Sequence, residues 1–462
     1  MLLKNKLENL KTYLNNNNVL TKIEERYCYS KDASNLCNEG KIPDLVVFVE
    51  TVEEVQKIVK YANQHDIPIV SRGAGTNMVG ACVCTRGGIV LNFSKMNKIL
   101  DINTVNMTAT VQPGVILKDL KDSADELGFF YPPDPSNYKV STVGGSIAQS
   151  SGGARALKYG TTKDYVLSLK IVTASGEIMT VGAKTAKDAS GYHLTQLLIG
   201  SEGTLGIIVE ATLKLIPKPE ATSVILAYFN NIENAVKAVE IINSEQISPS
   251  AIDFMDQNSL ITSEDFIKNS LRTNYKCMLL IELDGSKSSI SARLEKLYNI
   301  LQSEDAGDIS ISQNDADIEK MWEARRISFA ATSRLAPDVI SDDIIVPRQN
   351  LVQMIKKCEE VMKKYGLKMC LVGHIGDGNL HPQIALNLEN ELEYQNFTNA
   401  KAEIYNEVIK LGGTISAEHG IGIEKLSFFE QSIDKTALEF MKVIKKAFDP
   451  KNILNPDKIF RL

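Results

Sequence analysis

Two glycine-rich clusters constrain the fold of this chain more than any other feature of its sequence. The first is SRGAGTN at 71–77, directly after an apolar run, and the second is TVGGSIAQSSGG at 142–153. Glycine lets a main chain turn tightly and approach a ligand closely. Successive backbone N–H groups in such loops can bind phosphate oxygens without a lysine. Either cluster alone is explained by a tight turn, but the pair, with Pro-Asp-Pro-Ser at 133–136 between them, favours a nucleotide-cofactor cradle.

The two best-known nucleotide motifs are absent. Met78 stands where the dinucleotide fingerprint G-x-G-x-x-G requires a glycine, and no Gly-Lys-Ser/Thr occurs. The first cluster instead ends a strand–helix–strand unit. Its parts are an apolar run at 45–49, a helix with apolar residues at 52, 55, 58, 59 and 62, and a second apolar run at 67–70. Thr51 and Glu54 have the spacing of a capping box at the start of that helix.

The rest of the chain divides into a β-rich part and a part in which strands and helices alternate. Runs at 166–173 and 177–181 predict a hairpin, 203–216 closes the first half, and Pro217 and Pro219 mark a boundary. Strands expected at 223–228, 251–255, 276–282 and 340–346 alternate with helices at 232–243, 288–302, 318–334 and 351–365. This pattern predicts an α+β cap domain of ferredoxin-like type.

We therefore expect four parts: an N-terminal helical segment at 1–42, a cofactor-binding domain at 43–219, a substrate or cap domain at 220–420, and a C-terminal helical segment at 421–462 that packs back on the cofactor-binding domain. A chain of 462 residues has room for these cores without disulfides. The formal net charge of −6 argues against a nucleic-acid partner. Seven cysteines without C-x-x-C, no apolar signal core and no run of about 18 apolar residues predict a cytoplasmic protein with no transmembrane segment.

Three of the five histidines form a second pattern. His374 and His381 flank the turn sequence Gly-Asp-Gly-Asn, and Glu418-His419 follows later. A straight strand would place the first two on opposite faces, whereas a turn can bring them to one point. Two histidines and one carboxylate form a metal set with open coordination positions, which suits catalytic zinc and also non-haem iron. A single histidine would more simply be a packing or surface residue.

The glycine clusters, with Pro133–Ser136 and Tyr159-Gly160, resemble the FAD-binding domain of vanillyl-alcohol-oxidase-type flavoproteins. Within that group the chain is most similar to D-lactate dehydrogenases, D-2-hydroxyglutarate dehydrogenase and the large glycolate oxidase subunit. The resemblance runs from about Pro43 to the C-terminus and implies a two-part α/β FAD-binding domain, an α+β cap and a helical C-terminus. No histidine lies in the first loop, so we expect non-covalent FAD. The residues that the resemblance assigns to FAD are Arg72, Gly73, Ala74, Gly75, Thr76, Asn77, Pro133, Asp134, Pro135, Ser136, Thr142, Val143, Gly144, Gly145, Ile147, Ala148, Ser151, Gly152, Gly153, Tyr159, Gly160, Glu202, Gly203, Gly206, Ile207, Ile208 and Asn455.

The histidine pattern resembles the metal site of D-2-hydroxyacid dehydrogenases. The resemblance makes His374, His381 and Glu418 ligands of one divalent metal (zinc, iron or manganese) and His419 the general base. It also places Gln383 at the substrate and makes Arg325 the clamp for the substrate carboxylate. An imidazole titrates close to neutral pH and is well suited to take the hydroxyl proton. The alternative interpretation of Arg325 is a surface ion pair.

The implied reaction is oxidation of a small D-2-hydroxy acid, with hydride passed to flavin N5. Diacid-specific relatives carry further polar partners where this chain has Phe329 and Ser341, which favours a monocarboxylate such as D-lactate. The electron acceptor is expected to be an electron-transferring flavoprotein, an iron–sulfur subunit, a cytochrome or a quinone. Alternatives are a glycolate oxidase-like subunit of a larger complex, a D-2-hydroxyglutarate dehydrogenase, a flavin-free metallohydrolase and a non-catalytic flavoprotein scaffold.

Overall fold

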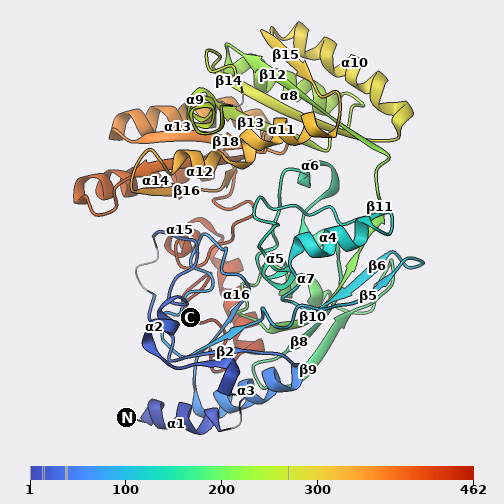
Figure 1. Ribbon diagram of the computed structural model, residues 1–462. Coiled ribbons are helices and arrows are strands. Elements are labelled where there is room, and N and C mark those ends of the chain that lie inside the picture. Colours follow the sequence, from blue (N-terminus) through green and yellow to red (C-terminus); the bar gives the residue numbers. More distant parts are fainter. Residues whose placement is uncertain (1, 13, 15, 37–39, 269) are drawn as a thin grey trace. The chain divides into compact units, whose positions relative to one another are not determined.

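The computed structural model describes residues 2–12, 14, 16–36, 40–268 and 270–462, and the chain forms two compact units (Figure 1). Unit 1 comprises Met1–Ser151, Thr161–Lys218 and Glu418–Leu462. Unit 2 comprises Gly152–Gly160 and Pro219–Ala417. The short segment 152–160, which directly follows the second glycine cluster, thus belongs to the same unit as the cap strands.

Unit 1 contains a mostly parallel sheet with the order β1-β2-β4-β3. Its strands are β1 (Val19–Leu20), β2 (Leu45–Phe48), β4 (Ile89–Asn92) and β3 (Ile69–Arg72), and only β1 runs antiparallel to its neighbour. Helix α3 (Val52–His65) joins β2 to β3 and confirms the predicted strand–helix–strand unit. Thr51 caps this helix, accepting from the N–H of Glu54 at 3.2 Å. The expected capping box is wrong in its second arm, because the Glu54 carboxylate reaches back one residue further, to the N–H of Glu50.

The second sheet of unit 1 is antiparallel, with the order β5-β6-β10-β8-β9. Its strands are β5 (Ile99–Asn103), β6 (Thr108–Val111), β10 (Ile207–Lys214), β8 (Val166–Val172) and β9 (Ile178–Gly182), and β8 with β9 forms the predicted hairpin. The apolar face of α3 packs with residues of both sheets in one core cluster. A small sheet pairs β7 (Phe129–Phe130) with β11 (Ile216–Pro217). The remaining helical elements are α1 (Leu2–Lys11), η1 (Asn16–Asn18), α2 (Ile23–Tyr27), α4 (Leu117–Asp125), α5 (Val143–Gln149), η2 (Thr162–Asp164), α7 (Leu194–Leu198), α15 (Leu426–Ser432) and α16 (Lys435–Phe448).

Unit 2 begins as a ferredoxin-like motif, as the alternating pattern predicted. Its elements in chain order are β12 (Ala221–Phe229), α8 (Ile232–Ser244), β13 (Ala251–Asp256), α9 (Gln257–Ile267), β14 (Cys277–Gly285), α10 (Lys287–Ser303) and β15 (Asp308–Ile311). They pair antiparallel in the order β15-β12-β14-β13. Side chains alternate across a strand, and β12, β13 and β14 are buried along nearly their whole length, so this part of the sheet is covered on both faces. Helices α8 and α10 pack on β12 and β14, whereas residues of α9 and α11 (Asp315–Arg326) join the core cluster of the other face (Figure 1).

The sheet continues from β13 through β18 (Lys368–Gly373) and β19 (Asn379–Leu386) to β16 (Asp338–Ser341), and β17 (Ile344–Ile345) pairs with the other end of β19. The single strand expected at 340–346 is therefore wrong, because Asp342 and Asp343 separate two short strands that pair with different parts of β19. The single helix expected at 318–334 is also wrong. It breaks at Ile327 into α11 and α12 (Ser328–Thr332), and α12 packs against β19.

The other helical elements of unit 2 are α6 (Ala156–Tyr159), η3 (Arg348–Asn350), α13 (Leu351–Tyr365) and α14 (Glu391–Lys410). Among the described residues, no helix combines the length and the apolar character needed to cross a lipid bilayer.

Candidate functional site

The first part of the second glycine cluster, Val143–Gln149, is a helix and not the tight loop expected from its glycines. Thr142 is the N-cap of α5, and its hydroxyl accepts from the N–H of Gly145 at 3.2 Å. The N–H of Val143 donates to Val115 O and that of Gly144 to Pro113 O, both at 2.8 Å. The first-turn amides are thus bonded within the protein, so the expectation of phosphate-binding amides is wrong at 143–145. A cap residue followed by apolar spacing outweighed the poor helix propensity of glycine.

The first glycine cluster keeps the expected irregular backbone after β3. Gly75 has φ of +72°, a conformation that glycine adopts without strain. The Arg72 guanidinium folds beneath the loop, where it donates to Lys31 O at 2.7 Å and lies 5.4 Å from the Tyr29 ring centre. Within the described ranges, no protein acceptor takes the backbone N–H groups of 73–77. These amides are the ones that unit 1 offers to an anionic group such as a pyrophosphate.

The two clusters meet at Gly73 and Thr142. A Cβ atom on Gly73 would collide with the Thr142 hydroxyl, so only glycine permits this approach. Two buried polar atoms nearby in sequence, Ser141 Oγ and Gln149 Oε1, have no hydrogen-bond partner among the described residues. Buried polar groups are nearly always satisfied, and a bound ligand rich in polar atoms would satisfy them. This combination of unbonded amides, close glycine packing and unsatisfied polar atoms fits FAD.

The C-terminal segment closes unit 1 around Glu202. This buried side chain accepts from the N–H groups of Ile421 at 2.7 Å and Gly422 at 2.9 Å. Burial raises the pKa of Glu202 to about 7, although those two bonds lower it. Asn455 donates to Glu202 O at 2.6 Å and to Ala81 O at 2.7 Å. Glu202 and Asn455 therefore hold the 202–206 turn, from which β10 begins with Ile207 and Ile208.

Not all residues that the sequence assigned to FAD lie in unit 1. Pro133–Ser136 and Ser151 do, but Gly152, Gly153, Tyr159 and Gly160 lie in unit 2. There the segment is held by side chains on β14. Arg155 donates to both oxygens of Glu282, at 2.7 and 3.0 Å, and the Tyr159 hydroxyl donates to Asp284 at 2.6 Å. The sequence analysis did not predict that residues 152–160 belong to the same unit as the cap strands.

The imidazoles of His374 and His381 come together in unit 2. His374 follows β18 and His381 lies in β19, and the turn between them is closed by the N–H groups of Asp377 and Asn379, both donating to His374 O at 3.2 Å. The ring centres are 5.2 Å apart and the ring planes are inclined by 82°. The sequence motif therefore forms the turn that its glycines suggested, and it places two imidazoles side by side.

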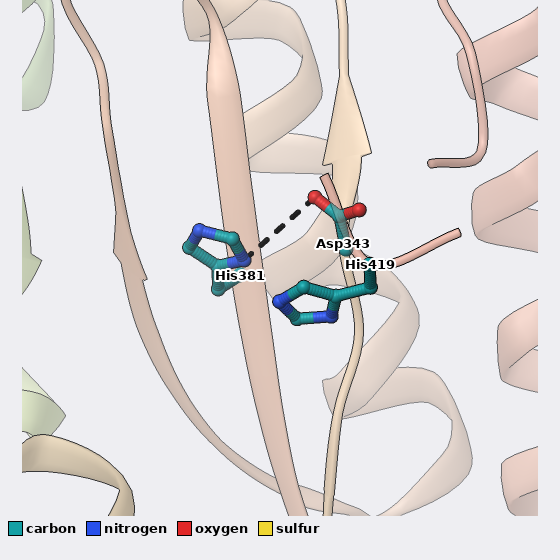
Figure 2. Close-up of side chains that lie close together, drawn as sticks. All are labelled: Asp343, His381 and His419. Atoms are coloured by element: carbon teal, nitrogen blue, oxygen red, sulfur yellow. Dashed lines mark ion pairs between the residues drawn. The ribbon is translucent and has the colours of Figure 1, made fainter. Parts of the chain in front are cut away.

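Each imidazole is oriented through its Nδ1 atom. His374 Nδ1 lies 2.8 Å from Asp253 Oδ1. His381 Nδ1 lies 3.3 Å from Asp342 O and 3.9 Å from Asp343 Oδ1, and Figure 2 shows the His381 ring and the Asp343 carboxylate facing each other. With the proton on Nδ1, the lone pair lies on Nε2, an atom through which imidazole binds metals. The pair fits a divalent cation.

Arg325 belongs to the same cluster. It lies at the C-terminal end of α11, and its Nε is 2.6 Å from Asp253 Oδ2, an ion pair in which the N–H is not aligned for a hydrogen bond. The Arg325 side chain is 11% exposed and that of Asp253 is 1% exposed. Burial works to raise the pKa of Asp253, but His374 and Arg325 outweigh it and hold that pKa below its usual range. A surface ion pair for Arg325, the alternative reading of the sequence, does not agree with this burial.

Gln383 is held by hydroxyls of α12. Its Oε1 accepts from Thr332 Oγ1 at 2.9 Å, and its Nε2 donates to Ser328 Oγ at 3.3 Å. These bonds fix the amide and join β19 to α12. Both amide ends thus have protein partners in the structure.

Glu418 and His419 open the last segment of unit 1, directly after Ala417 ends unit 2. On the unit 2 side, Asp343 Oδ2 accepts from Ala417 N at 2.8 Å and from Ser416 Oγ at 3.0 Å. On the unit 1 side, the backbone oxygen of His419 accepts from Asn77 Nδ2 at 3.2 Å, which joins it to the first glycine loop. The dipeptide is thus fixed on both sides by backbone bonds.

Sequence reasoning missed Asp253, Asp342 and Asp343. A detectable signal existed in each case. Asp253 is a carboxylate inside the apolar run AIDFM, and Asp342-Asp343 interrupt another apolar stretch. A buried charge is costly unless it is paired, so an acid in such a strand points to a partner with positive charge or an N–H group.

Comparison with known proteins agrees with this architecture. The FAD binding domain family matches residues 43–182, and the family of FAD linked oxidases, C-terminal domain, matches residues 218–459. The solved structure of p-cresol methylhydroxylase with substrate bound is similar with a TM-score of 0.84 at 18% identity, covering 99% of this chain and 97% of that one. At that identity the likeness shows the fold alone, which is that of the vanillyl-alcohol-oxidase type.

Relatives at higher identity are oxidoreductases. Glycolate oxidase subunit GlcD of Bacillus subtilis (strain 168) is 44% identical, over 94% of this chain and 92% of the relative. D-lactate dehydrogenase of Anaerostipes hadrus is 34% identical, over 90% and 89%. D-2-hydroxyglutarate dehydrogenase of Stutzerimonas stutzeri (strain A1501) is 30% identical, over 98% of both. The chain therefore belongs to the family of FAD-linked oxidoreductases that includes these 2-hydroxyacid-oxidising enzymes, as its motifs suggested.

Proposed function

We propose that this chain oxidises a small D-2-hydroxy acid, with D-lactate to pyruvate as the expected reaction, using non-covalent FAD and one divalent cation. The observation that carries the proposal is the buried carboxylate of Asp253, which contacts a metal-binding type of side chain, His374, and a carboxylate-binding one, Arg325. A 2-hydroxy acid presents a hydroxyl and a carboxylate on adjacent carbons. A cation bound by His374 and the guanidinium of Arg325, two side chains that both contact Asp253, would match those two groups.

The cation would be held by His374 and His381, with Glu418 as the third ligand. Support for Glu418 comes from chain connectivity. The N–H of Ala417 is bonded to Asp343, which in turn lies 3.9 Å from His381 Nδ1. Consecutive Cα atoms are about 3.8 Å apart, so the chain delivers Glu418 within side-chain reach of that position. Two imidazoles and a carboxylate leave coordination positions open for substrate; zinc, iron and manganese are the candidate metals.

Bound FAD would supply the acceptor for the hydride from the substrate Cα, and a bound cation would favour loss of the hydroxyl proton. The chain's own residues then have simple tasks. Arg325 binds the substrate carboxylate with two parallel N–H···O bonds, as guanidinium geometry allows. His419 takes the hydroxyl proton on its imidazole, and Gln383 lines the substrate side of β19.

A monocarboxylate is the preferred substrate because neither Phe329 nor Ser341 offers a positive charge to a second carboxylate. Phe329 lies on α12 with its ring partly exposed, and Ser341 pairs with Gln383 across β16 and β19. A second candidate is a glycolate oxidase-like subunit, which the 44% identical relative favours. D-2-hydroxyglutarate, named for the relative from Stutzerimonas stutzeri, requires a second cationic partner and is the weaker alternative.

The electrons must then leave to an acceptor, for which we propose an electron-transferring flavoprotein, an iron–sulfur subunit or a quinone, in the cytoplasm. The test is anaerobic bleaching of the purified yellow protein with D-lactate, L-lactate, glycolate and D-2-hydroxyglutarate, with and without a chelator. We expect D-lactate to bleach the flavin fastest and the chelator to stop it. A colourless protein, or bleaching unaffected by metal removal, contradicts the proposal, and faster bleaching by glycolate favours the second candidate.

A further inference from the structure

We propose that Asp253 is a positioning residue that sets two groups of the site at once: it fixes the tautomer of His374 and the orientation of the Arg325 guanidinium. The inference concerns residues of unit 2 only. It deepens the proposed function and rests on it, because a cation and a substrate carboxylate are the ligands that the two groups would receive.

The location of Asp253 is unfavourable for a carboxylate unless it has a role. It lies in the middle of β13, paired with Leu280 on β14, and β13 is buried along its whole length. Burying an unpaired charge costs several kcal/mol. Both oxygens of Asp253 are next to nitrogen atoms, Oδ1 at 2.8 Å from His374 Nδ1 and Oδ2 at 2.6 Å from Arg325 Nε. Its two oxygens are thus divided between two different side chains.

The contact with His374 selects one tautomer. A carboxylate is an acceptor only, so Nδ1 of a neutral imidazole beside it carries the hydrogen and Nε2 carries the lone pair. Carboxylate partners of this kind orient metal-binding histidines, and their loss lowers metal affinity about 10- to 100-fold. His381 has a weaker version, with a backbone oxygen at 3.3 Å and Asp343 at 3.9 Å. Asp253 is therefore the stronger of the two orienting acceptors.

The contact with Arg325 uses Nε and so leaves the two terminal nitrogens, Nη1 and Nη2, as the pair that meets a substrate carboxylate. Helix α11 is held separately one turn earlier, where Trp322 Nε1 donates to Glu282 Oε2 at 2.9 Å. Loss of Asp253 would therefore leave α11 in place and release only the guanidinium. A single substitution should weaken both cation binding and substrate binding, although these are chemically different events.

The test compares the full-length wild type with the Asp253→Asn variant. The control is Asp256→Asn, because Asp256 is also a buried aspartate of β13 but caps helix α9 and does not contact His374 or Arg325. The FAD content per chain is checked first, and three experiments follow: the His374 ring tautomer by ¹⁵N NMR of the metal-free protein at pH 8, the affinity for Zn²⁺ and Mn²⁺ by equilibrium dialysis, and the kinetics with D-lactate, which give KM and kcat. We expect Nδ1-protonated His374 in the wild type. In Asp253→Asn we expect mixed tautomers, cation affinity about 10- to 100-fold lower, a raised KM and unchanged FAD content. Asp256→Asn should match the wild type in all three.

If His374 of the wild type is protonated on Nε2, the inference is wrong. This measurement needs no variant, so the inference can still be tested if Asp253→Asn does not fold. Wild-type cation affinity and tautomer in a folded Asp253→Asn protein overturn it as well. Failure of the proposed function looks different: the wild type would bind no divalent cation or oxidise none of the acids, while the tautomer in the metal-free protein would still be set by Asp253.

Discussion

Replacement of Arg155 by alanine tests whether the segment 152–160 is held in unit 2 by a buried ion pair. Arg155 donates through Nε and Nη2 to the two oxygens of Glu282, at 2.7 and 3.0 Å. The Glu282 side chain is 1% exposed and that of Arg155 is 28% exposed. Arg155→Ala removes the positive charge and leaves Glu282 with the neutral donors Ser250 and Trp322.

The expected cost follows from this geometry. Removing one partner of a buried ion pair typically costs about 3–5 kcal/mol, because the other charge stays buried. Arg155 is partly exposed, so water can enter where its side chain was, and the two neutral donors remain. We therefore expect the low end of that range, a fall of about 3 kcal/mol in the free energy of unfolding of unit 2. Adding Glu282→Gln should recover part of the loss, since it removes the unpaired charge.

The assay is urea unfolding followed by tryptophan fluorescence. Trp322 is the only tryptophan of the chain, and its Nε1 donates to the same Glu282 carboxylate, so its emission reports on this network within unit 2. The matched control is Arg272→Ala, which removes an arginine from an exposed pair with Asp308 in the same unit. Exposed pairs contribute about 0–1 kcal/mol, so the control should barely move the transition. If Arg155→Ala shifts it no more than Arg272→Ala does, the segment is not held by this ion pair.

Further substitutions test the other features. His381→Ala should lose the divalent cation and most turnover but keep FAD, because the glycine cradle is built from other residues. Metal and flavin per chain are measured, and loss of the metal together with the flavin would contradict two independent sites. Gly73→Ala should lower the flavin content at least about tenfold by forcing a Cβ against Thr142, while metal content stays unchanged. Burial raises the pKa of Asp256 from 3.8 to about 6. Between these two pH values the folded state keeps a proton that the unfolded state loses, so the free energy of unfolding should fall by about 3 kcal/mol as the pH rises from about 4 to above 6. Asp256→Asn keeps an acceptor for the N–H of Ser259 and should abolish that decline in urea unfolding compared across pH; an unchanged slope would show that Asp256 is not its source.

The parts of the fold that could be predicted from sequence are those fixed by neighbours along the chain. Helix α3 has an apolar residue at each inward position and a capping threonine, and the β8–β9 hairpin has a turn signal between two apolar runs. In unit 2 the predicted alternation is confirmed for β12, α8, β13, β14 and α10, whereas α9 and β15 were not predicted from the sequence. Helix α5 was missed because the glycines of 144–145 are poor helix formers, and the cap at Thr142 decided the local structure.

The features that sequence could not predict depend on partners far away in the chain. Asp253 meets His374 and Arg325 only because β13, β18 and α11 come together in unit 2. Glu282 meets Arg155 across more than a hundred residues in the same way. The motif around His374 was recognisable because its two imidazoles lie close in sequence, whereas the acids beside them, Asp253 and Asp343, lie far from the motif in sequence. Local patterns thus identify the groups that carry the chemistry but not the groups that position them.

Three of the four positions at which the chain crosses from one unit to the other carry predicted site residues. Ser151-Gly152 and Gly160-Thr161 border the segment expected at the flavin, and Ala417-Glu418 precedes the expected third ligand and base. A crossing residue is bonded covalently to both units, so its backbone position depends on anchors in each. For the last crossing these anchors are Asp343 in unit 2, which holds Ala417 N, and Asn77 in unit 1, which holds His419 O. We therefore expect loss of the Asp343 acceptor to release Ala417 N, and with it the backbone that leads into Glu418 and His419.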